Sequence, residues 1–312
     1  MNKSGITIDD LYKKADMDSN VLKDPDVAYL VINRNKVLGL KGIPGLNIDT
    51  EELEDGVKAL ITVDDNTIIK KDVHLCFGML SKEGTQRIIT KTIVGKNSRI
   101  SILSHCVFTT AVNIRHIMEG EIEVGENSEY TYMEKHIHGK SGGVKVYPHA
   151  KVILKKNARF KTEFDLIKGR AGYLDIDYDI EGDEKSIMEM TSKVNAYGDD
   201  VIKISEKGHL KGEGSKGFLN SRIAVRENAK AEVYNKIKAD APYCVGHVDC
   251  KELIQDNGVA TAIPIVEVTN PKARVTHEAA IGSVDSKQLQ TLMSRGLSEE
   301  EATDVIIQGI LS

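Results

Sequence analysis

Short stretches in which apolar and polar residues alternate dominate the chain from about residue 66 to residue 275. A period of two places successive side chains on opposite faces, so each stretch predicts a β-strand with one buried face. A nine-residue phrase recurs between them: an apolar residue, two polar ones, a turn residue with a small neighbour, a polar residue and an apolar position that opens the next strand. Six copies begin at Val94, Val124, Val146, Leu154, Ile204 and Val225.

The turn residues of these copies do not recur at a constant interval. They fall at positions 97, 127, 149, 157, 207 and 228, so the intervals are 30, 22, 8, 50 and 21 residues. This spacing argues against a hexapeptide acyltransferase coil. It favours an irregular parallel β-helix, in which successive strands turn corners and loops differ in length. A β-sandwich is the alternative that the same pattern allows.

The first 65 residues predict a small α+β cap. Thr7 can cap a short helix that begins at Ile8, with acidic residues in its first turn. The apolar run at residues 28–32 predicts a strand, and the glycines and proline of residues 39–46 predict a loop.

The last 37 residues, 276–312, change to a helical period. Asp285 can cap one helix that Gly296 ends, and Ser298 with Glu301 forms a capping box for a second helix. Acidic residues crowd the start of the second helix, which argues against helix-turn-helix DNA binding because phosphate would repel them. We therefore expect an amphipathic helix pair that docks a partner protein.

The composition fits many thin layers of aliphatic residues. The 312 residues include no Trp, 5 Phe and 6 Pro against 26 Gly, so Ile, Val, Leu and Ala must build most of the core. A formal net charge of −5 argues against a general nucleic-acid binder. No apolar run is long enough for a membrane span, and the acidic N-terminal residues do not resemble a signal peptide. We expect a cytoplasmic protein.

Several polar patterns within the β region have both a chemical and a structural interpretation. One strand face carries four acidic residues, Asp175, Asp177, Asp179 and Glu181. Such a ladder could bind calcium or act on a sugar. The alternative is a solvated face whose charge is balanced by Lys on the next rung. His136 and His138 also share a face, which permits metal capture; the alternative is an exposed edge. His74 and Cys76 share a face as well, and there a packed cysteine is the simpler interpretation.

A cluster of metal-ligating residue types marks the end of the β pattern. Cys244, His247, Asp249 and Cys250 lie within seven residues, and the pair His277-Glu278 begins 27 residues after Cys250. Thiolate, imidazole and carboxylate together are ligands for iron or zinc. The cysteine spacing does not form a zinc-ribbon knuckle, so residue types and spacing alone leave the metal role open. The four cysteines are also too scattered to form a disulfide scaffold.

The same region carries a resemblance to a known family. Three segments resemble the SufB/SufD family of iron–sulfur cluster assembly scaffolds. They are Gly246-His-Val-Asp-Cys250, Thr276-His-Glu-Ala279 running on to Ile281-Gly-Ser-Val-Asp285, and Leu292-Met-Ser-Arg-Gly-Leu-Ser-Glu-Glu-Glu-Ala302. The resemblance covers roughly residues 70–312. The His-Glu pair favours the SufB branch. The short N-terminal region is similar to the minimal SMS type (SmsB), in which one SufB-like protein pairs with one SufC-like ATPase.

The resemblance implies a fold and roles for individual residues. The family core is a right-handed parallel β-helix followed by C-terminal helices. Cys250 matches the cysteine required for building the cluster, and His277 and Glu278 match its partners. Cys106 matches the position that receives sulfur as a persulfide, although Ser104-His105 replaces the family's Glu-Gly before it. Cys76, Cys244 and His247 match no family role and are weaker candidates for metal ligands.

The predicted fold is thus mainly β, with an N-terminal cap (1–65), a parallel β-helix (66–275) and a C-terminal helix pair (276–312). The resemblance implies a scaffold rather than an enzyme. It would bind an Fe–S cluster transiently, [4Fe-4S] or [2Fe-2S], beside a SufC-like ABC ATPase on a separate chain. The other expected partners are a second copy in a B2C2 complex, a sulfur donor and apo Fe–S proteins. The alternatives are an adaptor for the ATPase without its own cluster, and a calcium- or carbohydrate-binding β-helix.

Overall fold

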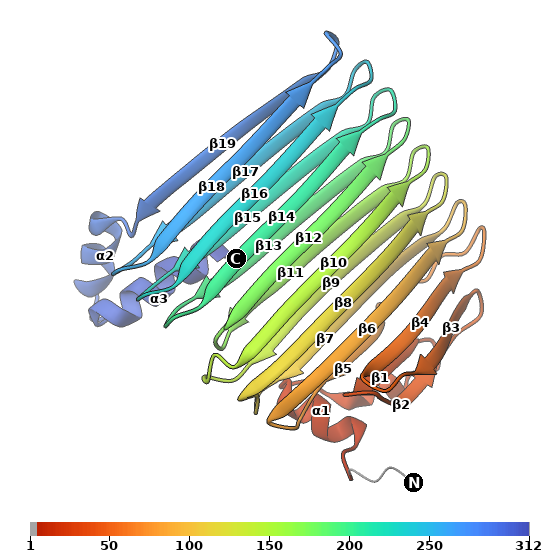
Figure 1. Ribbon diagram of the computed structural model, residues 1–312, viewed down its shortest axis with the longest axis horizontal. Coiled ribbons are helices and arrows are strands. Elements are labelled where there is room, and N and C mark those ends of the chain that lie inside the picture. The colour runs from red at the N-terminus through yellow and green to blue at the C-terminus, as the bar shows by residue number, and fades with distance from the viewer. Residues whose placement is uncertain (1–4, 312) are drawn as a thin grey trace.

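The computed structural model describes residues 5–311 and consists of two facing β-sheets wound as one flattened coil (Figure 1). Every second strand of the coil belongs to the same sheet, and coil neighbours within a sheet pair in parallel. The predicted parallel β-helix is therefore confirmed. A β-sandwich is excluded, because its sheets consist of antiparallel strands.

The first sheet has ten strands and the second has nine. In spatial order the first sheet contains β19 (Arg274–Ser283), β17 (Val245–Ile254), β15 (Lys216–Val225), β13 (Ile187–Ala196), β11 (Arg159–Lys168), β9 (Glu129–His138), β7 (Arg99–Phe108), β5 (Val73–Gly78), β1 (Tyr29–Asn33) and β2 (Lys36–Lys41). The second sheet contains β18 (Val259–Val268), β16 (Lys230–Ala239), β14 (Val201–Leu210), β12 (Tyr173–Gly182), β10 (Val144–Leu154), β8 (Asn113–Val124), β6 (Glu83–Val94), β4 (Gly56–Val63) and β3 (Leu46–Glu52).

The period-two alternation determines which side chains form the core. In β13, Met188, Met190 and Val194 are buried between the sheets, whereas Glu189 on the other face is exposed. Pairing is in register, so Met190 lies beside Leu219 of β15 and inward-facing positions form continuous columns along the coil. These columns build one core that extends over nearly all rungs.

One corner of the coil is built from a ladder of asparagines. Asn66, Asn97, Asn127 and Asn157 all have positive φ, between 54° and 58°, a region in which Asn is tolerated better than most residues. The side-chain amide of each of the last three donates to the side-chain oxygen of the preceding one, at 3.0, 3.1 and 2.9 Å. The corner residues therefore stack as regularly as the strands.

The coil is more regular than the sequence phrase predicted. Positive φ continues at the same corner at Lys185, Gly214 and Tyr243, so this corner recurs every 28 to 31 residues. The copies that begin at Val146 and Ile204 were wrongly interpreted as turns, since most of each lies inside β10 or β14. Both segments satisfy their backbone hydrogen bonds through strand pairing, although their residue types resemble a turn. The copy from Val225 turns the opposite corner.

The N-terminal segment extends the coil and covers part of it. β1 pairs in parallel with β5, and β4 pairs in parallel with β6, so both sheets continue into the first 65 residues. The predicted helix is α1 (Ile8–Lys14), capped by Thr7, and a short 3-10 helix follows at Ser19–Lys23. The predicted strand at 28–32 is β1. The predicted loop at 39–46 is shorter, because β2 pairs with β1 as far as Lys41.

The C-terminal helices α2 (Ser286–Met293) and α3 (Glu299–Leu311) form as the capping signals predict. Asp285 accepts from the backbone N–H of Gln288 at 2.7 Å, and Ser298 and Glu301 form the capping box. α3 packs Ile307 and Leu311 against the outer face of the first sheet. Within residues 5–311, no helix has the length and apolar character needed to cross a membrane.

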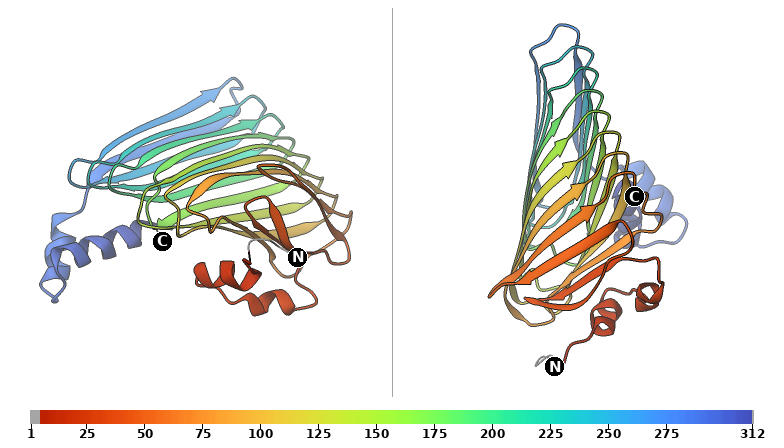
Figure 2. Two further views of the ribbon diagram at one scale, coloured as in Figure 1. Left: turned by 60° about the horizontal axis from the view of Figure 1, so that its bottom comes forward. Right: turned by 90° about the vertical axis from the view of Figure 1, so that its right-hand side faces the viewer.

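The two ends of the coil differ. At the first end the antiparallel strands β2 and β3 lie at the sheet edges, and α1 lies over the outer face of the first sheet (Figure 1). At the other end, β18 and β19 are the last strands of their sheets, and within the described chain no further strand covers their inward side chains (Figure 2). Val268 and Ile281, which face inward there, are 43% and 45% exposed.

Candidate functional site

A cluster of polar side chains lies inside the coil around Cys106 of β7. The Cys106 Sγ is 3.6 Å from His116 Nε2, and the thiol donates to Glu134 Oε1 at 3.7 Å. Glu134 Oε1 is 2.7 Å from His136 Nε2, and His138 Nε2 lies 3.2 Å from the other ring nitrogen of His136. All five residues are buried. We call them the Cys106 cluster.

Strand register brings the Cys106 cluster together. His136 pairs with Cys106 on the next rung, and Glu134 pairs with Ser104, so all four side chains point inward from β7 and β9. His116 reaches the same space from β8 of the facing sheet. The prediction that His136 and His138 share a face is confirmed. The alternative of an exposed edge is wrong, since this face is the interior.

Burial controls the protonation of the Cys106 cluster. It raises the pKa of the Cys106 thiol well above its usual range, and the nearby Glu134 adds to this rise. Burial likewise lowers the pKa of His138 to about 3 and that of His116 well below its usual range. At neutral pH Cys106 is therefore a thiol, and His116 and His138 are neutral imidazoles.

A second polar cluster surrounds Cys250 of β17. Cys250 is fully buried, and Asn235 of the facing sheet donates to its Sγ at 3.7 Å. Ser221 on the preceding rung donates to Glu252 at 3.3 Å, and Ser192 donates to Glu206 at 2.6 Å. Burial raises the pKa of both carboxyls to about 7 and that of the Cys250 thiol to about 11. These six residues are the Cys250 cluster.

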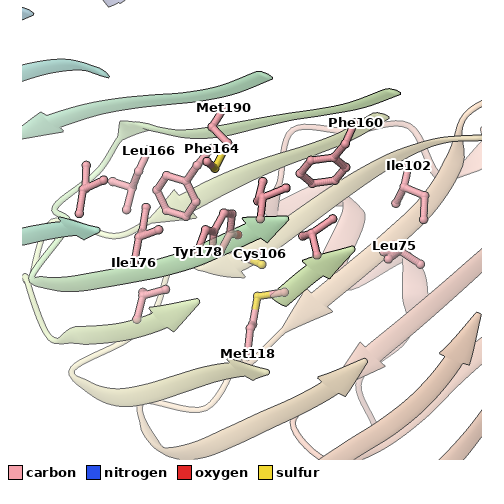
Figure 3. Packing of buried hydrophobic residues seen from close by; sticks show 14 of the residues in the cluster. Leu75, Ile102, Cys106, Met118, Phe160, Phe164, Leu166, Ile176, Tyr178 and Met190 are labelled. Carbon is pink, nitrogen blue, oxygen red and sulfur yellow. The ribbon is translucent and has the colours of Figure 1, made fainter. Parts of the chain in front are cut away.

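An aromatic layer lies between the two clusters. Phe164 of β11 occupies the inward column that contains Glu134 before it and Ser192 after it. Tyr178 of β12 points into the interior from the facing sheet, close to Cys106 (Figure 3). Both rings are buried. The interior is thus a single core with two polar sections and apolar packing between them.

His277 and Glu278 lie on the strand that neighbours Cys250, on opposite faces of it. Both are exposed on the last strand, β19, where His277 pairs with Val248 and Glu278 with Asp249. The partner of Cys250 on that strand is Ala279. Because the strand period is two, His277 shares the inward face of Cys250 whereas Glu278 is on the outer face.

The remaining cysteines and His247 lie in other environments. Cys244 occupies the corner before β17, where its Sγ lies 3.3 Å from Ser215 Oγ of the preceding corner. Cys76 faces outward and is packed beneath α1 with Leu11 and Tyr12, as the simpler interpretation of its strand predicted. His247 is on the outer face of β17, 2.8 Å from Thr276 Oγ1 and stacked on Phe218. None of the four cysteines forms a disulfide.

The carboxylate ladder of β12 is balanced by lysines of the next rung. Lys207 contacts Asp177 at 2.8 Å, and Lys211 contacts Glu181 at 2.6 Å. The same strand pairing places Lys203 beside Asp175. This arrangement agrees with the solvated-face interpretation and counts against a calcium site at this ladder.

Sequence reasoning missed Glu134, His116, Glu206 and Glu252 as members of the interior clusters. The sequence does contain a signal for Glu134. One rung at this part of the coil is 30 residues, and Glu134 follows Ser104 by 30 residues just as His136 follows Cys106. This interval indicates that Glu134 lies on the same face as His136, next to Cys106. His116 and Glu206 come from the facing sheet. A constant rung length does not align positions between the two sheets.

Comparison with known proteins decides the family. The family model described as "SUF system FeS cluster assembly, SufBD core domain" matches residues 79–310. The chain belongs to the SufBD family. An iron–sulfur cluster assembly SufBD family protein of Pyrococcus horikoshii is 39% identical to it over 302 residues, which are 97% of this chain and 92% of that one. One of Methanocaldococcus jannaschii is 39% identical over 282 residues, 90% of this chain and 89% of that one.

This SufBD chain also has a local similarity to a protein of the SufB branch. The iron–sulfur cluster assembly protein SufB of Bacillus subtilis is 42% identical over 66 residues, which cover 21% of this chain and 14% of that protein. The family resemblance predicted from the motifs around Cys250 and His277 is therefore confirmed. The chain is an Fe–S cluster assembly protein of the SufBD type.

Proposed function

We propose that this chain is the scaffold on which an Fe–S cluster is built, in complex with a SufC-like ABC ATPase on a separate chain. The observation that carries the proposal is that a SufBD family chain holds both Cys106 and Cys250, which match the family's sulfur-acceptor and cluster positions, in one continuous buried core. A closed apolar interior protects a sulfane sulfur from water and from exchange with external thiols. The scaffold itself would catalyse no reaction.

In this proposal Cys106 accepts sulfur and Cys250 is a ligand of the growing cluster. A persulfide on Cys106 would pass its outer sulfur to an acceptor thiolate, releasing the Cys106 thiolate with no net redox change. Burial opposes ionisation of both thiols, so the interior must open or gain a cation for the transfer to proceed. ATP-driven dimerisation of the ATPase would supply such an opening.

We propose that the complete cluster site includes a second copy of the chain. Cys250 and His277 face the inside of the last rungs, whereas Glu278 faces outward within the same chain. A homodimer formed through the uncovered end of the coil would bring a second set of these ligands nearby. Mixed thiolate, imidazole and carboxylate ligation suits a [2Fe-2S] or [4Fe-4S] cluster that must be released to apo Fe–S proteins.

The helix pair would dock the ATPase with the surface that the coil leaves free. α3 uses Ile307 and Leu311 to pack on the first sheet, and Arg226 holds Asp304 at 2.8 Å. Met293 of α2 and Val305 of α3 remain exposed, at 41% and 47%. The docking surface would therefore be the outer side of the pair.

We also propose that the chain acts in the cytoplasm and belongs to the short SMS-type branch. It matches the archaeal relatives over about nine tenths of their length but only 14% of the B. subtilis SufB. This pattern supports a two-component system of one SufB-like chain and one ATPase. The sulfur donor would be a further partner.

Anaerobic reconstitution tests the proposal. The purified chain, alone and with its partner ATPase, is incubated with ferrous iron and sulfide, and bound iron, sulfide and charge-transfer absorption are measured. Cys250→Ser and Glu278→Ala should each lose most of the cluster, whereas the matched control Cys76→Ser should retain it. Equal binding by all variants would mean that the site is misplaced. A chain that co-purifies with the ATPase but holds no cluster would favour the adaptor alternative.

A further inference from the structure

Three buried residues of the Cys106 cluster have the composition and spacing of a metal site, namely Cys106, Glu134 and His136. We propose that Cys106, His116, Glu134 and His136 bind one divalent transition-metal ion inside the coil, separately from Cys250. One ligand atom each from Cys106, Glu134 and His136 lies within 4.8 Å of the others, and all three residues are buried. This proposal goes beyond the proposed scaffold function and does not depend on it.

A hydrogen-bond chain fixes which nitrogen of His136 faces the site. His138 Nδ1 lies 2.9 Å from the carbonyl oxygen of Arg170, which can only accept, so the His138 proton is on Nδ1. His138 Nε2 lies 3.2 Å from His136 Nδ1, so this contact occupies the Nδ1 side of the His136 ring. The other nitrogen, Nε2, faces Glu134. Such orientation by outer hydrogen bonds is typical of histidine metal ligands.

The Nε2 atom of His136 faces a carboxylate oxygen of Glu134. The two atoms are 2.7 Å apart, a distance that requires either a proton or a metal ion between them. The other oxygen of Glu134, Oε2, is buried and has no hydrogen-bond partner among the described residues. A cavity of about 40 Å³ lies beside Glu134, Met118 and Tyr178. The carboxylate thus has both unused bonding capacity and adjacent space.

Two distances from the Cys106 sulfur are those expected between neighbouring ligands of a tetrahedral ion. With metal–sulfur bonds of about 2.3 Å and metal–nitrogen or metal–oxygen bonds of about 2.0 Å, tetrahedral ligands place sulfur roughly 3.5 Å from each nitrogen or oxygen. The observed distances from Cys106 Sγ are 3.6 Å to His116 Nε2 and 3.7 Å to Glu134 Oε1. The 2.7 Å contact between Glu134 and His136 would lengthen by roughly 0.5 Å.

A divalent ion would balance the charge of the ligand set. A thiolate, a carboxylate and two neutral imidazoles carry two negative charges, which one divalent cation neutralises in a site that water does not reach. Thiolate and imidazole select borderline ions such as Fe(II), Zn(II) and Co(II) over Mg(II) or Ca(II). The bound ion would also hold Cys106 as a thiolate, the form that its burial otherwise opposes.

Cobalt(II) is a suitable probe because a thiolate ligand gives it an intense charge-transfer absorption and tetrahedral coordination gives it strong visible bands. The reduced, metal-free full-length chain is titrated anaerobically with Co(II), without iron or sulfide. We expect one ion per chain with both features. X-ray absorption of the loaded wild type should show one sulfur at about 2.3 Å and three nitrogen or oxygen atoms near 2.0 Å.

Variants then place the ion. Cys106→Ser should abolish the charge-transfer band, and Glu134→Gln and His136→Gln should each weaken binding at least tenfold. The matched control Cys250→Ser removes a buried cysteine of the same core and should leave the titration unchanged, although the proposed function predicts that it loses the cluster. Circular dichroism verifies that each variant folds. The X-ray absorption measurement uses the wild type alone, so it does not depend on the folding of any variant.

The outcomes that overturn the proposal are specific. The proposal is wrong if the wild-type chain shows no thiolate charge-transfer band, or if X-ray absorption shows two sulfur ligands. It is also wrong if Cys250→Ser removes the band and Cys106→Ser retains it. Weak binding of Co(II) by surface histidines would give no thiolate charge-transfer band, so it would also contradict the proposal. Failure of cluster reconstitution leaves this result untouched, because the titration uses no sulfide.

Discussion

Cys106 and Cys250 face the same interior from strands of one sheet that are five steps apart, β7 and β17. At the spacing of about 4.8 Å between neighbouring strands, the two positions are roughly 24 Å apart along the coil. Phe164 lies in a rung between them, and both Phe164 and Tyr178 are buried in the core. A sulfur atom cannot pass directly from one thiol to the other in this closed state, so transfer requires a carrier or an opening of the coil.

The closed state predicts very slow modification of Cys250. Its pKa of about 11 lowers the thiolate fraction near pH 8 about 100-fold relative to an exposed cysteine of pKa 9, and complete burial slows the reaction further. Alkylation with iodoacetamide followed by peptide mass spectrometry should therefore label Cys250 at least 100-fold more slowly than the unfolded chain.

The matched control for this experiment is Ser294→Cys, which adds an exposed cysteine at the end of α2. Position 294 should react at the rate of a free thiol in the same sample. Labelling of Cys250 at a comparable rate would show that the coil opens readily without the ATPase. A faster rate only when the ATPase and ATP are present would identify the opening step.

Glu206 predicts that stability falls as the pH rises from about 4.5 to about 7. Burial raises its pKa from 4.5 to about 7, so the folded state binds the proton more tightly than the unfolded state. The stability from this group is complete below about pH 4.5 and is lost as the pH rises through about 7. Glu206→Gln keeps an acceptor for Ser192 and should reduce the fall in unfolding free energy between pH 5 and pH 8 by about 2 kcal/mol.

Urea unfolding at the two pH values measures this effect. Glu189→Gln, on the exposed face of β13, is the control and should not change the pH dependence. Glu252 has the same direction of shift, so part of the pH dependence should persist in the Glu206→Gln variant. If the unfolding free energy of Glu206→Gln changed with pH as much as that of the wild type, this result would contradict a buried, protonated Glu206 carboxyl.

The asparagine ladder predicts different costs for two substitutions at one site. Asn127 combines a φ of 58° with side-chain bonds to Asn97 and Asn157. Asn127→Gly loses the bonds but adopts this φ without strain, whereas Asn127→Ala loses the bonds and also strains the backbone by about 1 kcal/mol. Urea midpoints should therefore rank wild type above Gly and Gly above Ala. An Ala variant as stable as Gly would show that the corner relaxes.

Individual residues show what sequence reasoning can reach in this chain. The alternation and the Asn residues at 97, 127 and 157 were sufficient to predict the coil, because a corner with positive φ restricts the residue types that it accepts. The segments around His149 and Lys207 have similar residue types but form strands, since pairing with neighbouring rungs outweighs a weak local preference. Turn chemistry alone therefore misjudged the rung length.

The same limit applies to the interior clusters. Period two shows that His136 and His138 share a face, but which face is inside depends on the rest of the rung. The contact between Cys106 and His116 joins facing sheets, and the sequence contains no register between sheets. The motifs around Cys250 and His277 identify the family, yet pairing on β19 determines that Glu278 points away from Cys250.

The uncovered end of the coil predicts a homodimer that a single charge disrupts. A solenoid end without a polar cap exposes core positions, and Ile281 here faces inward on the last strand while 45% exposed. In the proposed dimer Ile281→Glu would place a charge within an apolar interface, where desolvation strongly opposes association. We expect the wild type to be dimeric and this variant monomeric when size-exclusion chromatography is combined with light scattering.

Ile153→Glu is the matched control for this prediction. Ile153 is almost equally exposed, at 44%, but lies on the outer face of β10, away from the last rung. This variant should remain dimeric, so a general effect of the added charge on solubility is separated from an effect at the interface. A monomeric wild type, or an Ile281→Glu variant that stays dimeric, would contradict association through this end of the coil. The cluster ligands would then have to come from one chain.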